Sequence, residues 1–288
     1  MNQAPLSVTA DNKSREYGDA NPSFTGTLNG VKNSDNITAS YSSSATPASA
    51  VGGYDIVPSL HDPDSKLGNY TLASTNGTLT VIPAPLSAKA DDKIMTLNGT
   101  VPSLTGTLSG AKNNDGISVS FTTSVNGQTV GKFVDAIVPV LFDPNGKLSN
   151  YSAVLTNGTL WVQYASSAGT CNGDAGHTIL QPINLDGTSV FKQGSTVPAK
   201  FRVCDANGTS IAQAGVVQSF ASTVMNGTPG GVNETIVSTT PDTAFRWDST
   251  SQQWIFNIST TNLSANHTHI YVVTLNDGSQ ITFRFALK

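Results

Sequence analysis

The stretch that decides the fold is Pro5-Leu-Ser-Val-Thr-Ala10, which recurs 80 positions later as Pro85-Leu-Ser-Ala-Lys-Ala90. At the same offset, Pro22-Ser-Phe-Thr-Gly-Thr-Leu28 recurs as Pro102-Ser-Leu-Thr-Gly-Thr-Leu108. Self-similarity at a fixed period is typical of a chain built from copies of one structural unit. The sequence therefore predicts two copies of one unit before the C-terminal region begins.

The repeat continues at an offset of 81 positions. One residue is therefore gained between Leu108 and Ile137, and we assign it to a loop around Val125–Gln128, because loops tolerate changes of length. We predict three domains, at residues 1–84, 85–165 and 166–288. The matches at the second offset are Ile56-Val-Pro58 with Ile137-Val-Pro139, Lys66-Leu-Gly-Asn-Tyr70 with Lys147-Leu-Ser-Asn-Tyr151, and Asn76-Gly-Thr-Leu79 with Asn157-Gly-Thr-Leu160.

The local pattern within each copy is that of short β-strands. Apolar and polar residues alternate in Leu6–Ala10 and again in Ile117–Phe121. Several strands of about 5 to 7 residues closed by turn residues are typical of a β-sandwich or barrel, and a copy of about 80 residues favours a small sandwich. Two prolines stiffen the seam Ile82-Pro-Ala-Pro-Leu86. We expect an all-β chain of three tandem small Ig-like β-sandwich modules in an elongated arrangement.

Charge is scarce in this chain. Its 288 residues include 15 Lys and Arg against 19 Asp and Glu, for a net charge of −4, and only Glu16 and Glu234 are glutamates. Glu-rich helical folds are therefore excluded. The lack of a basic run argues against nucleic acid and against anionic membrane surfaces as partners. No apolar stretch approaches the roughly 20 residues of a membrane span.

The start of the chain, Met1–Pro5, lacks the basic and apolar regions of a signal peptide. Low charge with abundant Thr, Ser and Asn is nevertheless typical of exported β-proteins. We therefore expect an extracellular or cell-surface protein whose export signal has been removed.

The residues of copy one carry a family resemblance. In them the copy resembles the MBG ("mostly bacterial Ig-like") repeat, whereas copy two keeps both ends but reads Leu97-Asn-Gly99 in place of the Tyr-Gly pair. The segments that carry the resemblance are Pro5–Ala10, Tyr17-Gly-Asp-Ala-Asn-Pro22 with Phe24, Val51-Gly-Gly-Tyr54, and Asn69-Tyr70 through Asn76-Gly-Thr-Leu-Thr-Val81.

The C-terminal region carries a second set of motifs, led by Pro198-Ala-Lys-Phe201 and accompanied by Phe245-Arg-Trp247 and Trp254-Ile-Phe256. In these motifs it resembles the PxKF domain. Both resemblances imply surface or secreted proteins of bacteria or related microbes, with modules in tandem and without known chemistry of their own.

Two cysteines, Cys171 and Cys204, fall in the last predicted domain. An even count within one domain of an exported protein predicts a disulfide. It would close a loop of about 34 residues and stabilise the domain by about 3 to 4 kcal/mol. The alternative is a pair of buried thiols.

No cluster of residues predicts a metal, a cofactor or a catalytic site. Asp62-Pro-Asp64 and Asp143-Pro-Asn145 offer too few oxygens for Ca²⁺ and are explained as turns. His267-Thr-His269 supplies two of the four ligands that Zn²⁺ requires. No nucleophile or phosphate-binding motif occurs. We therefore expect a protein that is not an enzyme.

Lys200 is a candidate for a spontaneous amide bond with an Asn or Asp side chain, which requires a buried lysine beside an acid. The strand Val197–Val203 directs alternate apolar residues inward. Lys200 and Arg202 are therefore expected on the opposite, solvent-facing side, which disfavours the bond.

Two kinds of sugar contact stay open. Trp247 and Trp254 flank an expected hairpin loop and could form a platform for a bound glycan, although the apolar alternation around them favours a core role. Thirteen Asn-x-Ser/Thr sequons occur, five of them Asn-Gly-Thr turns that explain much of the excess. The candidate glycosylation sites are Asn69, Asn76, Asn150, Asn157, Asn207, Asn226 and Asn257.

The function that these features predict is that of a non-catalytic extracellular structural module, acting as a surface spacer, adhesion or assembly unit. One alternative is a module that binds a glycan or another protein. A second is a filament subunit, in which Asn2–Ala10 pairs with an open sheet edge of the next molecule. The expected partners are further copies of the chain or other surface proteins.

Overall fold

The computed structural model describes residues 2–166, 170–226, 232–236 and 240–288. Strands make up 51% of the chain and helices 2%, which confirms the all-β prediction. The chain divides into two compact units: unit 1 contains residues 1–90, 105–122 and 138–157, and unit 2 contains residues 91–104, 123–137 and 158–288. The predicted boundaries near residues 84 and 165 stay predictions.

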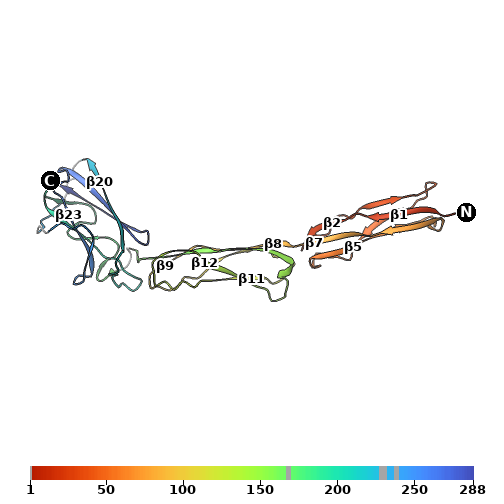
Figure 1. The fold of residues 1–288 in the computed structure, drawn as a ribbon, viewed down its shortest axis with the longest axis horizontal. Coiled ribbons are helices and arrows are strands. Elements are labelled where there is room, and N and C mark those ends of the chain that lie inside the picture. Colours follow the sequence, from red (N-terminus) through yellow and green to blue (C-terminus); the bar gives the residue numbers. More distant parts are fainter. Residues whose placement is uncertain (1, 167–169, 227–231, 237–239) are drawn as a thin grey trace. The chain divides into compact units, whose positions relative to one another are not determined.

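The first strand set lies in unit 1 and consists of seven strands in two sheets. One sheet has the strand order β3-β1-β6 and the other β2-β7-β5-β4, so that β2, β7 and β5 lie side by side (Figure 1). The elements are β1 (Ala4–Ala10), β2 (Lys13–Glu16), β3 (Gly26–Asn29), β4 (Thr38–Ser42), β5 (Gly52–His61), the 3₁₀ turn η1 (Leu67–Asn69), β6 (Tyr70–Thr75) and β7 (Gly77–Ile82).

The second strand set repeats this topology, since every strand takes the place of the one seven positions earlier. The sheet orders are β10-β8-β13 and β9-β14-β12-β11. The elements are β8 (Ala84–Ala90), β9 (Lys93–Thr96), β10 (Gly106–Ser109), β11 (Ser118–Thr122), β12 (Gly131–Phe142), η2 (Leu148–Asn150), β13 (Tyr151–Thr156) and β14 (Gly158–Gln163).

The extra residue of the second set does not lie where we placed it. In β5, Tyr54 pairs with Leu79 and Ile56 with Gly77, whereas in β12 the register shifts between Phe133 and Ile137. Three residues instead of one separate the paired positions there, and Asp135 adopts the left-handed conformation with φ of 57°. The gain is thus a β-bulge inside a strand, partly offset by a shorter preceding loop, and the prediction for Val125–Gln128 was wrong.

The N-terminal segment is a central strand of its own sheet. Strand β1 pairs in parallel with β6 over Ala4–Thr9 and antiparallel with β3 over Ser7–Ala10. One edge is thus paired over most of its length and the other over Ser7–Ala10, and Leu6, Val8 and Ala10 are buried. In this fold β1 is paired within its own sheet, which gives no support to the alternative that Asn2–Ala10 pairs with a neighbouring molecule, and that alternative stays a prediction.

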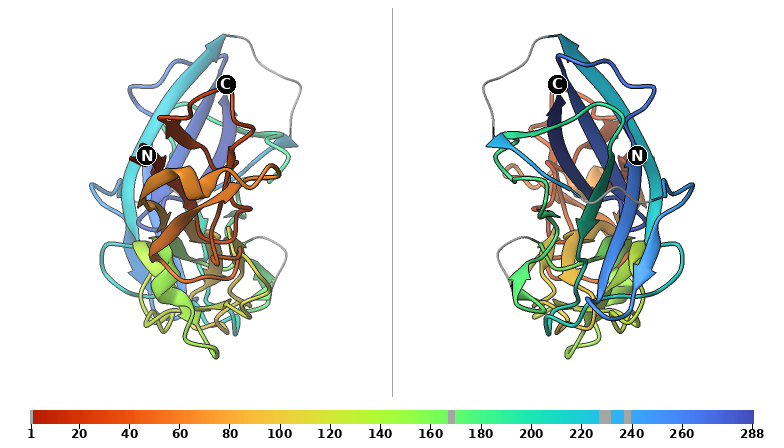
Figure 2. Two further views of the ribbon diagram at one scale, coloured as in Figure 1. Left: turned by 90° about the vertical axis from the view of Figure 1, so that its right-hand side faces the viewer. Right: turned by 90° about the vertical axis from the view of Figure 1, so that its left-hand side faces the viewer.

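The remaining strands belong to unit 2, where β20, β24 and β25, coloured cyan to dark blue, lie side by side (Figure 2). The larger sheets have the orders β20-β24-β25-β18-β21 and β17-β19-β23-β22. The strands are β15 (Thr170–Cys171), β16 (Asp174–Ala175), β17 (Ile179–Leu180), β18 (Ser189–Phe191), β19 (Thr196–Phe201), β20 (Val217–Asn226), β21 (Val232–Asn233), β22 (Arg246–Asp248), β23 (Gln253–Ser259), β24 (His267–Leu275) and β25 (Gln280–Leu287).

An aromatic core joins these two sheets. Phe220 of β20 lies 5.0 Å from Phe256 of β23 and 5.3 Å from Tyr271 of β24, measured between ring centroids. Val197, Ala199 and Phe201 of β19 are buried, as their alternation predicts. Large rings that touch across two sheets supply much of the apolar burial of a sandwich.

Arg202 does not face solvent as we predicted, since only 8% of it is exposed. Its guanidinium donates hydrogen bonds to the backbone oxygens of Ser251 and Gln252, and it forms an ion pair with Asp174. The turn that joins β22 and β23 thus covers this arginine. The alternation of residues along a strand does not predict that a loop from elsewhere in the chain covers one of its faces.

Candidate functional site

The site begins at Tyr17, which follows β2 in a turn closed by the bond from the Asp19 N–H to the Glu16 oxygen at 3.3 Å. Gly18 has φ of 85°, a conformation that favours glycine. The buried guanidinium of Arg15 supports the turn by donating to the backbone oxygen of Glu16 at 3.0 Å. A turn residue is usually exposed, yet only 1% of Tyr17 is exposed.

Tyr17 is buried because its ring enters the start of the second strand set, within unit 1. Its hydroxyl donates to the carboxylate of Asp115 at 3.0 and 3.2 Å, and the hydroxyl of Tyr151 donates to the same carboxylate at 2.7 Å. The two rings meet edge to face with centroids 5.4 Å apart. Asp115 is 7% exposed, so two tyrosines supply the hydrogen bonds that water would otherwise give.

Three further contacts surround Tyr17. The Lys112 Nζ lies 3.1 Å from an Asp19 oxygen, the Asn113 amide donates to the Pro47 oxygen at 3.2 Å, and the Asn150 oxygen accepts the Val51 N–H at 3.0 Å. We call the five receiving residues the Tyr17 socket. They are Lys112, Asn113, Asp115, Asn150 and Tyr151.

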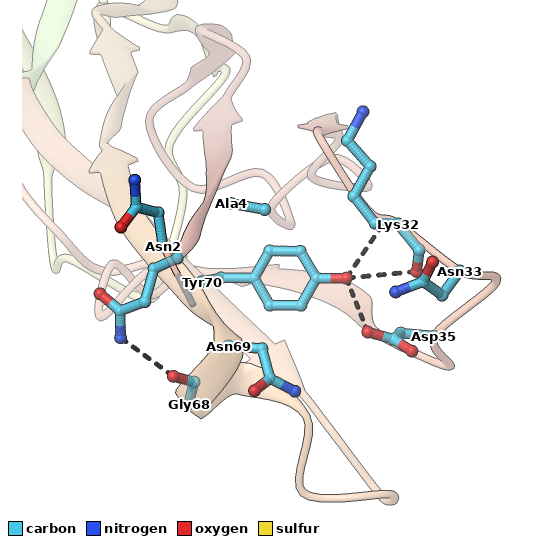
Figure 3. Close-up of a pocket in the computed structure, with 9 residues that line it drawn as sticks. Asn2, Ala4, Lys32, Asn33, Asp35, Gly68, Asn69 and Tyr70 are labelled. Carbon is cyan, nitrogen blue, oxygen red and sulfur yellow. Dashed lines mark hydrogen bonds between the residues drawn. The ribbon is translucent and has the colours of Figure 1, made fainter.

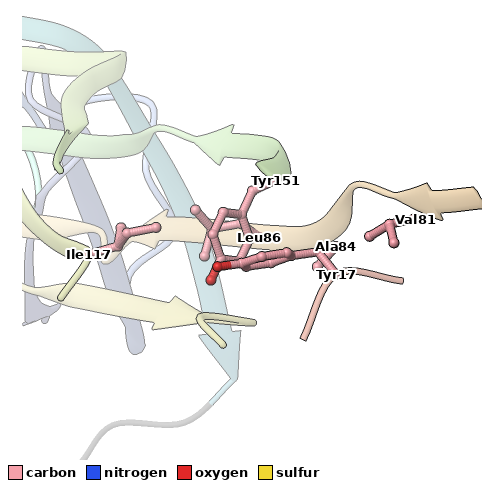
Figure 4. Close-up of a cluster of buried hydrophobic side chains, with 6 residues drawn as sticks. All are labelled: Tyr17, Val81, Ala84, Leu86, Ile117 and Tyr151. Atoms are coloured by element: carbon pink, nitrogen blue, oxygen red, sulfur yellow. The ribbon is translucent and has the colours of Figure 1, made fainter. Parts of the chain in front are cut away.

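An apolar cluster lies beneath these polar contacts (Figure 4). It combines Tyr17 and Val81 of the first strand set with Ala84, Leu86 and Ile117 of the second, together with Tyr151. All six are at most 8% exposed. One continuous core therefore holds the two strand sets together at this end.

The electrostatics of the site keep both tyrosines protonated. Burial raises the pKa of the Tyr17 hydroxyl, and the neighbouring Asp115 carboxylate adds to the effect. Burial and the hydrogen bond to Asp115 raise the pKa of Tyr151 to about 12. Only a protonated hydroxyl can donate to the carboxylate, so both hydrogen bonds are kept, and the bond from Tyr17 joins the first strand set to the second. We call this arrangement the tyrosine lock.

Unit 2 contains a different set of contacts at the equivalent end of the second strand set. Leu97 stands at the position of Tyr17, and its oxygen accepts the N–H of Ala206 at 2.9 Å. The Asn98 amide donates to Asp205 at 2.9 Å, and the Tyr164 N–H and hydroxyl donate to Asp277 and Asn276, each at 2.8 Å. At this end, backbone and amide contacts thus take the place of the tyrosine–carboxylate bonds, and the side chain at the Tyr17 position is a leucine.

The predicted disulfide is confirmed. Cys171 and Cys204 are bonded, with their Cα atoms 5.6 Å apart. Cys204 follows β19, and its backbone oxygen accepts the Ala165 N–H at 2.8 Å. The bridge thus connects the segment that leads into the C-terminal strands with the segment that follows β19, a core strand.

The candidate glycosylation sites differ in exposure. Asn69, Asn76, Asn157 and Asn207 are exposed and stay predictions. We expect no glycan on Asn150 or Asn257, which are 5% exposed: Asn150 holds the Val51 N–H, and the Asn257 amide donates to the Thr240 oxygen. The side chain of Asn226 lies outside the described residues.

The remaining candidate groups have local roles. Asp62 and Asp143 accept backbone N–H groups of their own turns, and these bonds lower the pKa of both carboxyls. Ring nitrogens of His267 and His269 contact the backbone oxygens of Ala265 and Ser264. Within the described ranges, no group of three His, Cys, Asp or Glu side chains is arranged to hold a metal ion.

Trp254 belongs to the core, as its alternation suggested. It is 6% exposed, its indole N–H donates to the Ile211 oxygen at 2.9 Å, and its ring meets Trp247 edge to face. Trp254 is therefore not available as a sugar platform, whereas Trp247 is half-buried and the glycan alternative stays a prediction. Among the residues described, no helix has the length and apolar character needed to cross a membrane.

Comparison with protein families assigns the part of the chain that supplies Tyr17. Residues 6–80 match the MBG domain (YGX type). Tyr17-Gly18 is the one Tyr-Gly pair within the matched residues, so the pair in that description coincides with the residue that locks the two strand sets. The resemblance stated for copy one is thus confirmed for the MBG domain, and those stated for copy two and for the C-terminal region stay predictions.

Comparison with solved structures finds remote likenesses. The extracellular domains 3–5 of Drosophila OTK share 12% identity with this chain, with a TM-score of 0.28 over 99% of this chain and 96% of that one. Domains 4–9 of the surface layer protein SbsC share 11% identity, with a TM-score of 0.19 over 99% and 48%. Likenesses this remote say nothing of what the chain does. No curated protein matches it.

Sequence reasoning missed the Tyr17 socket, although the sequence carries a signal for it. Lys112-Asn113-Asn114-Asp115 repeats Lys32-Asn33-Ser34-Asp35 at the offset of 80, in a segment that otherwise reads as a polar turn. A turn that keeps its Lys, Asn and Asp in two copies indicates a shared role for these side chains. The segments that define the repeat in the sequence analysis do not include this turn.

Proposed function

We propose that this chain is a non-catalytic structural module of an extracellular protein, in which successive Ig-like repeats are joined by fixed junctions. In that role it acts as a spacer that also serves adhesion or assembly. The observation that carries the proposal is the hydrogen bond from Tyr17 to the buried carboxylate of Asp115. The buried carboxylate of Asp115 is thus used to join the two strand sets.

The domain organisation is part of this proposal. We infer an MBG-like repeat in residues 1–84, a second in 85–165 and a PxKF-like sandwich in 166–288. The equal strand order of the first two sets supports the repeat. The disulfide between Cys171 and Cys204 supports an extracellular location, because disulfides persist in oxidising compartments.

A spacer is useful only if its junctions hold a fixed geometry. The Ile82–Ala84 connection has Pro83 between β7 and β8, and the first residue of β8 is buried in the apolar cluster. A stiff connection and a buried anchor together leave the two strand sets of unit 1 little freedom to rotate. For the glycan-binding alternative, the described residues offer no comparable observation.

The proposal is tested by a distance distribution across the junction. Spin labels on cysteines at the exposed, equivalent positions Ser42 and Thr122 report the distance by pulsed electron spin resonance. We expect one narrow distribution, which Tyr17→Ala broadens and the matched surface change Lys32→Ala leaves unchanged. A broad distribution in the parent chain would overturn the fixed junction.

A further inference from the structure

A hollow of about 440 Å³ lies at the end of the first strand set where β1 begins (Figure 3). Its lining includes Lys32, Asn33, Asp35, Asn69 and Tyr70. These are the same five residue types, at the repeat offsets of 80 and 81, as those of the Tyr17 socket. We call this second group the open socket.

The open socket has the internal geometry of the filled one. Tyr70 donates to Asp35 at 2.7 Å and accepts the Lys32 N–H at 2.9 Å. The corresponding distances from Tyr151, to Asp115 and from the Lys112 N–H, are 2.7 and 2.8 Å. The carboxylate is therefore already oriented to accept a second hydroxyl.

The apolar floors of the two sockets correspond as well. Leu6, Ile37 and Tyr70 form the buried part of the floor in the open socket. Leu86, Ile117 and Tyr151 take these places in the filled one, and Tyr17 and Val81 are added to them from the preceding repeat. The open socket thus contains everything that the filled one contributes from its own strand set.

The two sockets differ in the exposure of three pairs of equivalent residues. Asp115 is 7% exposed, Asn150 5% and Ala84 0%, whereas Asp35 and Ala4 are half-buried and Asn69 is exposed. A Tyr-Gly turn and the loop that supplies the Pro47 oxygen and the Val51 N–H provide that cover at the filled socket.

We propose that the open socket binds the Tyr-Gly-Asp turn of another MBG-like repeat, placed in line ahead of Ala4. The incoming tyrosine donates to Asp35 and packs its ring on Tyr70. The incoming aspartate pairs with Lys32, for which the described residues provide no ion pair. A backbone N–H of the same repeat reaches the Asn69 oxygen.

A second copy of this chain does not fit this socket through Tyr17. That residue is 1% exposed because it fills the socket of its own neighbour, and withdrawing it would open one socket to fill another. The occupant must therefore be a repeat whose Tyr-Gly turn is not already engaged. The inference rests on the proposed function, since it extends the same junction by one step.

A duplicated chain can supply this occupant, because the sequence at the start of β1 matches that at the start of β8. Ala4-Pro5-Leu6 and Ala84-Pro85-Leu86 are identical, so residues 1–83 can be followed directly by residues 4–288 without changing the local sequence of a junction. In this duplicated chain the outer Tyr17 faces the inner Asp35, and the inner Tyr17 faces Asp115 as before.

The test is zero-length crosslinking of the duplicated chain with a carbodiimide, followed by peptide mass spectrometry. The reagent joins a lysine Nζ to a nearby carboxylate as an amide and takes up the lost water as a urea. The Asp19–Lys112 crosslink, expected from the ion pair at 3.1 Å, is the internal standard. We expect an additional Asp19–Lys32 crosslink that is absent from the parent chain.

Two matched variants assign each crosslink to its junction. Asp19→Asn in the outer copy should remove Asp19–Lys32 alone, and Asp19→Asn in the inner copy should remove Asp19–Lys112 alone. In the unsubstituted duplicated chain, absence of the Asp19–Lys32 crosslink while Asp19–Lys112 forms overturns the inference and leaves the proposed function standing. Absence of both crosslinks from that unsubstituted chain overturns both, and an Asp19–Lys32 crosslink in the parent chain overturns the requirement for an added repeat.

Discussion

The two sockets of unit 1 are built from the same five residue types, but only one of them is filled by a tyrosine from a neighbouring strand set. In the filled socket, the Asp115 carboxylate accepts from two tyrosine hydroxyls, and in the open socket Asp35 accepts from one. Their floors and hydrogen-bond distances correspond, so the fold builds each socket without help from the occupant. The comparison teaches that the receiving side is preformed and that the Tyr-Gly turn only completes it.

Removing the occupant should have the largest effect on this comparison. Tyr17→Ala deletes a buried ring and leaves Asp115 and Asn150 as exposed as Asp35 and Asn69. We expect a loss of about 3 to 5 kcal/mol in the free energy of unfolding, as for other buried aromatic residues. Chemical denaturation measures the loss, and hydrogen exchange at the Val51 N–H locates it.

The matched control for Tyr17→Ala is Leu97→Ala at the equivalent position in unit 2. It should leave the exchange rate of the Val51 N–H unchanged. Equal protection of that N–H in Tyr17→Ala and the parent chain would contradict the lock.

Substituting the two carboxylates should lower the free energy of unfolding by a smaller amount, and by different amounts in the two sockets. Asp115→Asn weakens the hydrogen bonds of two tyrosines, whereas Asp35→Asn weakens that of one. Hydrogen bonds to charged groups contribute about 1.5 to 3 kcal/mol, so we expect a loss of this size for Asp115→Asn and a clearly smaller one for Asp35→Asn. Denaturant midpoints compare the two variants, and equal losses would show that Tyr17 adds nothing.

High pH should weaken the filled socket. The pKa of Tyr151 is raised to about 12, while an unfolded tyrosine loses its proton near pH 10. The folded state therefore holds this proton more tightly, and its contribution is complete below pH 10 and is lost between pH 10 and about 12. We expect a loss of about 1 to 2 kcal/mol, after allowance for screening by solvent.

The measurement is the free energy of unfolding as a function of pH. Tyr151→Phe should flatten its decline above pH 10, although Tyr164 and Tyr271, whose pKa values are also raised to about 12, keep part of it. An unchanged slope in Tyr151→Phe would contradict this assignment.

The smallest expected effect is that of the two lysines. Lys112→Ala breaks a partly exposed ion pair with Asp19, and such pairs contribute at most about 1 kcal/mol. Lys32→Ala in the open socket should have no measurable effect in the parent chain. In thermal denaturation, the difference between the two variants should shrink as salt is added, and a salt-independent difference would count against the ion pair.

The sequence was sufficient to predict the β class and the disulfide. Alternation in Leu6–Ala10 predicted a buried strand, and the recurrent segments fall in a second strand set that has the same strand order as the first. These features depend on local periodicity and on similarity along the chain, both of which are visible without coordinates.

The parts that could not be predicted depend on contacts between distant segments. Tyr17 reads as a turn residue until the second strand set covers it, and Asn150 reads as an exposed sequon until the Val51 N–H reaches it. Arg202 follows a strand whose alternation points it to solvent, but a remote turn encloses it. In each case, a side chain's environment is set by a neighbour more than 40 residues away.

The most direct test of the central claim is a double-mutant cycle between the two residues that join the strand sets. Tyr17→Phe removes the donated hydroxyl and keeps the ring, and Asp115→Asn removes the charge and keeps the shape. If the hydrogen bond couples the repeats, the free energies of unfolding of the two single variants and the double variant should give an interaction of about 1.5 to 3 kcal/mol. Additive losses, with an interaction near zero, would contradict the account.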